Sequence, residues 1–126
     1  MSKAMVIDDS RAIRMILSRT LREIGYEVCE ASNGREALAE LRAQRERGSV
    51  SLVLVDWNMP EMNGLEFVKQ VRSDTDFSAV TLMMVTTETE MERMVTALEA
   101  GADEYVMKPF TKEMIQDKLR ILGVIH

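Results

Sequence analysis

The stretch LVLVD, residues 52–56, is a short apolar run that ends on a carboxylate, Asp56. Three more apolar runs lead directly into reactive side chains: residues 5–7 into Asp8 and Asp9, residues 82–85 into Thr86, and residues 105–107 into Lys108. Such short, bounded runs are typical of strands buried on both faces of a parallel sheet. Because the carboxyl ends of parallel strands meet at one edge, the pattern predicts that three carboxylates, a hydroxyl and an ammonium group lie together.

Helical periodicity fills the segments between these runs. One apolar stripe leads up to Gly25, a typical C-terminal stop: Ile13, Ile16, Leu17, Leu21 and Ile24. Capping patterns predict four further helix starts: Asn33 with Glu36, Asn63 with Glu66, Thr89 with Glu92, and Thr111. The last two of these helices carry the apolar positions Met91, Met94, Val95 and Leu98, and Met114, Ile115, Leu119 and Leu122. A more polar run, residues 26–31, predicts an edge strand.

The resulting order, a strand followed by a helix five times over, predicts an α/β fold. Repeated units of this kind form a parallel sheet with right-handed crossovers and helices on both faces. Ligands of such sheets bind beyond the carboxyl ends of the strands, where the strand order reverses. The reactive side chains described above are expected at that edge.

Length and composition restrict the class of protein. The 126 residues suit a single domain, residues 1–126, with one core. The net charge of −5 and the lack of a clustered Lys/Arg stripe argue against a nucleic-acid-binding surface. No apolar run approaches the roughly 20 residues that span a bilayer, and the single cysteine, Cys29, excludes an intrachain disulfide. A cytoplasmic location without membrane contact is therefore expected.

The predicted cluster has the chemistry of a metal-dependent phosphoacceptor. Neighbouring carboxylates repel one another, a divalent cation relieves that repulsion, and oxygen-only ligands favour Mg²⁺, Mn²⁺ or Ca²⁺. Asp56 is the expected nucleophile, which would form an acyl phosphate, while Asp8 and Asp9 serve the metal. Thr86 and Lys108 could contact phosphoryl oxygens. Each residue alone is also compatible with a turn, a cap or a surface loop, and only their joint placement at successive strand ends favours function.

Five segments carry a further signal: residues 6–10 (VIDDS), 56–60 (DWNMP), 63–66 (NGLE), 84–86 (MVT) and 101–110 (GADEYVMKPF). Together they resemble the bacterial response-regulator receiver domain over essentially the whole chain, and most closely the chemotaxis regulators of the CheY type. The resemblance implies the flavodoxin/CheY-like (βα)5 fold, with a five-stranded parallel sheet of order 2-1-3-4-5.

The resemblance also implies how the acidic residues act. Asp56 would be phosphorylated by the phosphohistidine of a sensor histidine kinase. Mg²⁺, for which Mn²⁺ could substitute, would be ligated by Asp9, Asp56 and the backbone carbonyl of Asn58, with Asp8 acting mainly through water.

Further roles are implied for the switch residues. Lys108, joined to Pro109 by a cis peptide bond, would contact the phosphoryl group. Thr86 would move toward that group and vacate space that Tyr105 then fills. Two side chains would border the path of the attacking water and tune dephosphorylation: Asn58 and Glu88.

These features predict a stand-alone two-component response regulator and not an enzyme with a substrate of its own. The chain ends just after the fifth helix, so a monomer would signal by docking its fourth helix, fifth strand and fifth helix on an effector protein. Chemotaxis, with a flagellar switch protein as effector, is the expected pathway. The alternative is a receiver of another two-component pathway that acts as a phosphate sink or relay; the acidic residues 88–92 depart from the chemotaxis pattern.

Other classes fit less well. An aspartyl-nucleophile phosphatase would need an acid/base aspartate where Asn58 stands. A flavin or nucleotide protein would need a phosphate-binding loop where the anionic residues 8–10 stand. The intact set of phosphoacceptor residues argues against an interaction module that works without phosphorylation.

The remaining notable side chains have ordinary structural interpretations. Trp57 is expected to be a partly exposed loop aromatic, Cys29 a small buried residue and Lys118 a solvated cation. Met91 is expected in the core, whereas the periodicity does not decide whether Met94 lies in the core or on a docking surface. The only histidine, His126, is expected to lie in a frayed tail.

Overall fold

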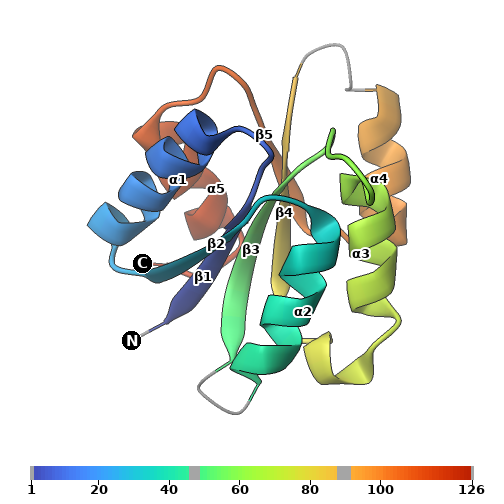
Figure 1. Ribbon diagram of the computed structural model, residues 1–126. Helices are drawn as coiled ribbons and strands as arrows, with labels where there is room; N and C mark the ends of the chain where they lie inside the picture. Colours follow the sequence, from blue (N-terminus) through green and yellow to red (C-terminus); the bar gives the residue numbers. More distant parts are fainter. Residues whose placement is uncertain (1, 46–48, 88–91, 126) are drawn as a thin grey trace.

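A computed structural model describes residues 2–45, 49–87 and 92–125 of the chain. Strands and helices alternate along it (Figure 1): β1 (Lys3–Ile7), α1 (Arg11–Ile24), β2 (Glu27–Ala31), α2 (Gly34–Gln44), β3 (Val50–Asp56), α3 (Gly64–Arg72), the 3₁₀ turn η1 (Thr75–Phe77), β4 (Thr81–Thr86), α4 (Met94–Ala100), β5 (Glu104–Met107) and α5 (Lys112–Ile121). All strand pairs are parallel and the order is β2-β1-β3-β4-β5. The predicted α/β fold and strand order are therefore confirmed.

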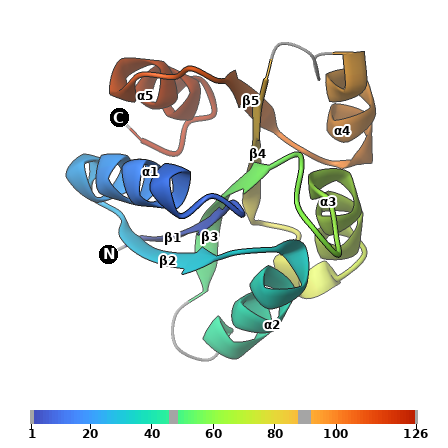
Figure 2. The same ribbon diagram turned by 45° about the horizontal axis from the view of Figure 1, so that its top comes forward.

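The helices cover both faces of the sheet. Figures 1 and 2 show α1 and α5 on one face and α2, α3 and α4 on the other. Side chains alternate between the faces along each strand, as the two-residue period of a strand requires. Met5 and Ile7 of β1 belong to the core under α2, α3 and α4, while Ala4 and Val6 belong to the core under α1 and α5.

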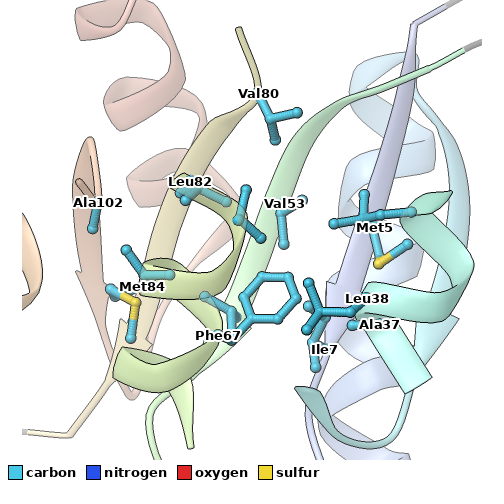
Figure 3. Close-up of a cluster of buried hydrophobic side chains, with 14 of the residues drawn as sticks. Met5, Ile7, Ala37, Leu38, Val53, Phe67, Val80, Leu82, Met84 and Ala102 are labelled. Carbon is cyan, nitrogen blue, oxygen red and sulfur yellow. The ribbon is translucent and has the colours of Figure 1, made fainter. Parts of the chain in front are cut away.

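The larger core is centred on Phe67 of α3, which is fully buried (Figure 3). Its ring lies among side chains of α2 and of the three central strands, including Leu38, Val53 and Met84. Burying an aromatic ring of this size stabilises a domain by about 1.5–3 kcal/mol relative to exposing it. This packing fixes α3, and with it the loop that carries the end of β3.

The ends of the helices mostly follow the sequence signals. Gly25 and Gly101 end α1 and α4 with a φ of 123°, a conformation that glycine adopts without strain. Asn63 and Glu66 form the predicted capping box at α3. Asn33 caps α2, but the Glu36 side chain bonds Ser32 and not the backbone of Asn33, so that box is incomplete. Thr111 caps α5 as predicted.

Helix α4 differs from its prediction. Its described part begins at Met94, after Arg93, which provides no capping hydrogen bond. Thr89 and Met91 lie outside the described residues. Met94 is buried, which settles its position in the core, whereas Val95 and Leu98 are exposed.

Several burial predictions are wrong. Ile16 of α1 and Met114 of α5 are exposed. Successive helical residues turn by about 100°, so each lies beside the buried side of its helix, which is centred on Leu17 and Leu21 in α1 and on Ile115 and Leu119 in α5. Trp57 is buried at 4% exposure, because it packs into the core beneath α3 and α4. Cys29 is only half-buried, since β2 is an edge strand. No helix among the described residues is long and apolar enough to cross a membrane.

Candidate functional site

The predicted reactive residues meet at the carboxyl edge of the sheet, at the top of Figure 1. Asp56 ends β3 and Thr86 ends β4, while Asp8 directly follows β1 and Lys108 directly follows β5. The strand register brings these ends level: Ile7 pairs with Val55, Asp56 with Val85, and Thr86 with Met107. Residues separated by up to 100 positions in the sequence thus become neighbours.

The three carboxylates form one cluster. Each of Asp8, Asp9 and Asp56 offers an oxygen within 4.8 Å of the others. Asp8 and Asp56 are buried, at 1% and 7% exposure, whereas Asp9 is exposed. The Lys108 Nζ lies 3.3 Å from Asp56 Oδ1 and 3.5 Å from Asp8 Oδ2. The cluster therefore holds one cation against three potential anions.

Burial and mutual repulsion perturb these groups. Burial, reinforced by the charge of Asp8, raises the pKa of Asp56 to about 6, and Lys108 only partly offsets this. Burial likewise raises the pKa of Asp8, against the opposing effects of the Ser10 N–H and Lys108. Burial alone would lower the pKa of Lys108, but the two carboxylates outweigh it and raise that pKa. The folded protein thus concentrates negative charge that it does not neutralise.

The donor set fits Mg²⁺. It consists of oxygen ligands only, and it provides two or three carboxylates at an open edge, which leaves room for waters and a phosphate oxygen. The loop after Asp56 would supply the backbone carbonyl of Asn58, an exposed residue. This loop is fixed by the Gly64 N–H, which donates to the Trp57 carbonyl at 2.9 Å. A Cβ on Gly64 would lie 2.6 Å from the Asp56 carbonyl oxygen, so only glycine allows α3 to start this close.

Thr86 and Lys108 are joined through the backbone. The Lys108 N–H donates to the Thr86 carbonyl at 2.7 Å, and the peptide bond from Lys108 to Pro109 is cis. The Thr86 hydroxyl is fully buried and donates to the Thr87 carbonyl at 3.2 Å. Glu88, expected to tune dephosphorylation, lies outside the described residues.

Tyr105 is half-buried on β5, and Lys118 of α5 covers its ring. The Lys118 Nζ lies 4.5 Å from the ring centroid and 3.2 Å from Glu104 Oε1. The expectation that Lys118 is simply solvated is therefore wrong: a cation near an aromatic face and an acidic partner is stabilised by both.

Two contacts near the site have no counterpart among the sequence predictions. Arg14 of α1 donates to the Asp8 carbonyl, and Arg93 lies over the Trp57 ring at 5.9 Å. No sequence pattern indicates the second contact. The first could have been suspected only because position 14 lies one helical turn after the Ser10 cap.

Comparisons with known proteins agree with this geometry. Residues 4–120 match the response regulator receiver domain family. The chain is 44% identical over 121 residues, 95% of each sequence, to the chemotaxis protein CheY1 of Helicobacter pylori. It is 42% identical over 123 residues to a chemotaxis protein CheY homolog of Campylobacter jejuni, covering 96% of this chain and 92% of that protein.

The fold comparison gives the same result. The chemotaxis response regulator CheY4 of Vibrio cholerae superposes with a TM-score of 0.87 at 38% identity, covering 97% of this chain and 98% of that one. This chain therefore belongs to the response regulator receiver domain family, as a close relative of the CheY chemotaxis regulators.

Proposed function

We propose that the chain, residues 1–126, acts as a single receiver domain that is switched by Mg²⁺-dependent phosphorylation of Asp56. The observation that carries this proposal is the convergence of three carboxylates within 4.8 Å, with the Lys108 ammonium 3.3 Å from Asp56. Asp8, Asp9, Asp56 and the Asn58 carbonyl would hold the ion. The phosphodonor is a sensor histidine kinase.

The transfer uses Asp56 as the nucleophile. A carboxylate oxygen of Asp56 bonds to phosphorus while the P–N bond of the donor phosphohistidine breaks, and the electron pair leaves with the imidazole nitrogen. Asp56 must be ionised to attack, which a pKa of about 6 allows at neutral pH. When bound, Mg²⁺ neutralises charge on the phosphoryl oxygens. The Lys108 ammonium, 3.3 Å from Asp56 Oδ1, would pair with the added negative charge.

The phosphorylated state signals through the α4–β5–α5 surface. Thr86 would turn its hydroxyl toward the phosphoryl group, and the Tyr105 ring would follow. A hollow of about 290 Å³ lies on this surface beside Tyr105, Met114 and Lys118. The exposed side chain of Ile121 of α5 also lines it, and α4 exposes the apolar side chains of Val95 and Leu98. We propose that an effector protein docks here in the phosphorylated state, in chemotaxis with a flagellar switch protein as the effector.

Chemical phosphorylation tests the proposal. The protein is incubated with phosphoramidate and Mg²⁺, and its intact mass is measured against Asp56→Asn and against a sample with excess EDTA. We expect one added phosphoryl group in the wild type alone, removed by mild base. An equal gain in Asp56→Asn, or a gain that is indifferent to EDTA, would refute the assignment.

A phosphate sink or relay is the alternative output. Purified flagellar switch protein, titrated with the phosphorylated and unphosphorylated forms, separates the two. We expect phosphorylation to tighten binding at least tenfold. No binding in either form, together with rapid return of phosphate to a histidine donor, would favour the relay.

A further inference from the structure

Arg14 of α1 contacts the backbone at the point where β1 leads into the acidic cluster. Its Nη1 donates to the Asp8 carbonyl oxygen at 2.6 Å, and its Nε lies 3.4 Å from Glu30 Oε1 of β2. The Arg14 side chain is only 17% exposed. The guanidinium therefore forms a largely enclosed bridge between α1, β1 and β2.

The Asp8 carbonyl needs this donor because the β1–β2 ladder ends there. Ile7 pairs with Ala31, the last residue of β2, and the Asp8 N–H donates to the Ala31 carbonyl at 3.2 Å. Beyond Ala31 the ladder does not continue, and Asp8 is 1% exposed. A buried carbonyl without a donor is unfavourable, and Arg14 supplies the donor.

The bond from Arg14 completes a set of hydrogen bonds that holds both the backbone and the carboxylate of Asp8. Asp8 is held at its N–H by Ala31, at Oδ1 by the Ser10 N–H at 2.8 Å, and at its carbonyl by Arg14. The Asp8 carbonyl shares a rigid peptide plane with the nitrogen of Asp9. Asp9 is exposed, and no hydrogen bond from another described residue holds its carboxylate. The peptide plane held by Arg14 thus fixes the Cα from which the Asp9 side chain extends.

We propose that Arg14, oriented by Glu30, is a positioning residue for the divalent-cation site. It holds the peptide between Asp8 and Asp9 so that their carboxylates converge with Asp56 before the cation binds. This inference rests on the proposed Mg²⁺ site. A guanidinium suits the role because it donates in two directions at once, which an ammonium on a flexible stem does less well.

A purely electrostatic role and a positioning role for Arg14 predict opposite changes in Mg²⁺ affinity when Arg14 is removed. A cation beside a divalent-cation site repels the ion, so removing it should tighten binding. If Arg14 acts by positioning, removing it should weaken binding instead. Outer contacts that orient metal ligands typically change affinity about 10–100-fold when lost. The direction of the change therefore separates the two roles.

The experiment measures the Mg²⁺ dissociation constant by calorimetric titration, together with the melting midpoint in EDTA. The variants are Arg14→Gln and the charge-conserving Arg14→Lys. The matched control is Arg11→Gln, which removes the same charge from an exposed position on the first turn of the same helix. We expect the dissociation constant to rise about tenfold in Arg14→Gln and at least threefold in Arg14→Lys, and to stay within twofold or fall in Arg11→Gln.

The outcomes are distinguishable. Unchanged or tighter Mg²⁺ binding in both Arg14 variants, whatever their melting midpoints, would overturn the positioning role and leave the metal site intact. If Arg14→Gln does not fold, the result for Arg14→Lys decides, because its charge is unchanged. Absence of Mg²⁺ binding by the wild type would overturn the metal site and the positioning role together.

Discussion

Charged side chains gather at both ends of the parallel sheet, but they are balanced differently. At the amino end, Arg72 of α3 bonds the Gly101 and Phe77 carbonyls at 2.9 and 3.1 Å and pairs with Asp103 at 2.9 Å. The same Asp103 oxygen accepts from the Leu82 N–H at 2.8 Å. In this Arg72 cluster one cation meets one anion, and the remaining donors meet carbonyls.

At the carboxyl end, a single ammonium faces an excess of carboxylates. Lys108 lies 3.3 Å from Asp56 and 3.5 Å from Asp8, with Asp9 beside them. The Arg72 cluster is matched and stabilises the fold, whereas the Asp56 cluster keeps negative charge that a bound cation or protonation would relieve. Net charge imbalance in a buried cluster is therefore the feature that distinguishes the proposed cation site from the structural Arg72 cluster.

Breaking the matched cluster should have the largest effect on stability. Arg72→Ala should lower the free energy of unfolding by roughly 2–4 kcal/mol, because it removes the side-chain donor of the Gly101 and Phe77 carbonyls and the cation paired with Asp103. Urea denaturation measures the change. Arg120→Ala, which removes an exposed pair with Asp117, is the control and should change stability by at most about 0.5 kcal/mol. A loss for Arg72→Ala no larger than this control would contradict the distinction.

Relieving the unmatched cluster should act in the opposite direction. Asp56→Asn should raise the free energy of unfolding at pH 7.5, without divalent cations, by roughly 1–3 kcal/mol, since folding moves the pKa of Asp56 from 3.8 to about 6. The folded carboxyl binds its proton more tightly than the unfolded one. The wild type therefore gains stability as pH falls from about 6 toward 4, and the advantage of the variant shrinks over that window.

Denaturation curves at pH 7.5 and pH 4.5 test this. Glu99→Gln on α4 is a control that removes one exposed carboxylate and should change stability at pH 7.5 by at most about 0.5 kcal/mol. Destabilisation by Asp56→Asn at pH 7.5 would show that the cluster is balanced after all.

Cation binding should relieve the repulsion among the carboxylates of Asp8, Asp9 and Asp56. Mg²⁺ at ten times its dissociation constant should stabilise the wild type by about 1.4 kcal/mol. It should also change the fluorescence of Trp57, the only tryptophan, which directly follows Asp56. Asp9→Ala should lose both responses. A full response in that variant would mean that the ion binds elsewhere.

The smallest effect is expected at the Lys118 contact. Glu104→Gln should change stability by no more than about 0.5 kcal/mol, since one neutralised partner of a partly exposed pair is worth little. It should nevertheless loosen Lys118 from the Tyr105 ring, so the ring-current shift of the lysine ε-methylene protons in NMR spectra should decrease. The ε-methylene protons of Lys112, whose ammonium group pairs with Glu23, serve as the internal reference for this shift. An unchanged shift would show that the ring holds Lys118 unaided.

The sequence was sufficient to predict most of the scaffold and the acidic cluster. The apolar runs that lead into Asp56, Thr86 and Lys108 are visible in the local sequence, and a parallel sheet brings their carboxyl ends to one edge. The order of the strands within that sheet came from the resemblance to receiver domains. Capping at Asn63 and Thr111 is likewise a local interaction.

What the sequence did not reveal depends on packing between distant elements. Burial of Trp57 requires α3 and α4 to be in place, and the Lys118 contact requires the β5–α5 geometry. The Arg14 bond depends on where the β1–β2 ladder stops. Exposure of Ile16 depends on which side of α1 faces the sheet, and a stripe wider than the buried surface does not specify that side.

The most direct test of the account is diffraction from crystals soaked in Mn²⁺, using its anomalous signal to locate the ion. We expect one ion bound by carboxylate oxygens of Asp9 and Asp56 and by the Asn58 carbonyl, with water completing the shell. An ion bound at some other part of the chain, or none at the carboxyl edge at saturating Mn²⁺, would contradict the central claim that this edge is a cation-dependent phosphoacceptor site.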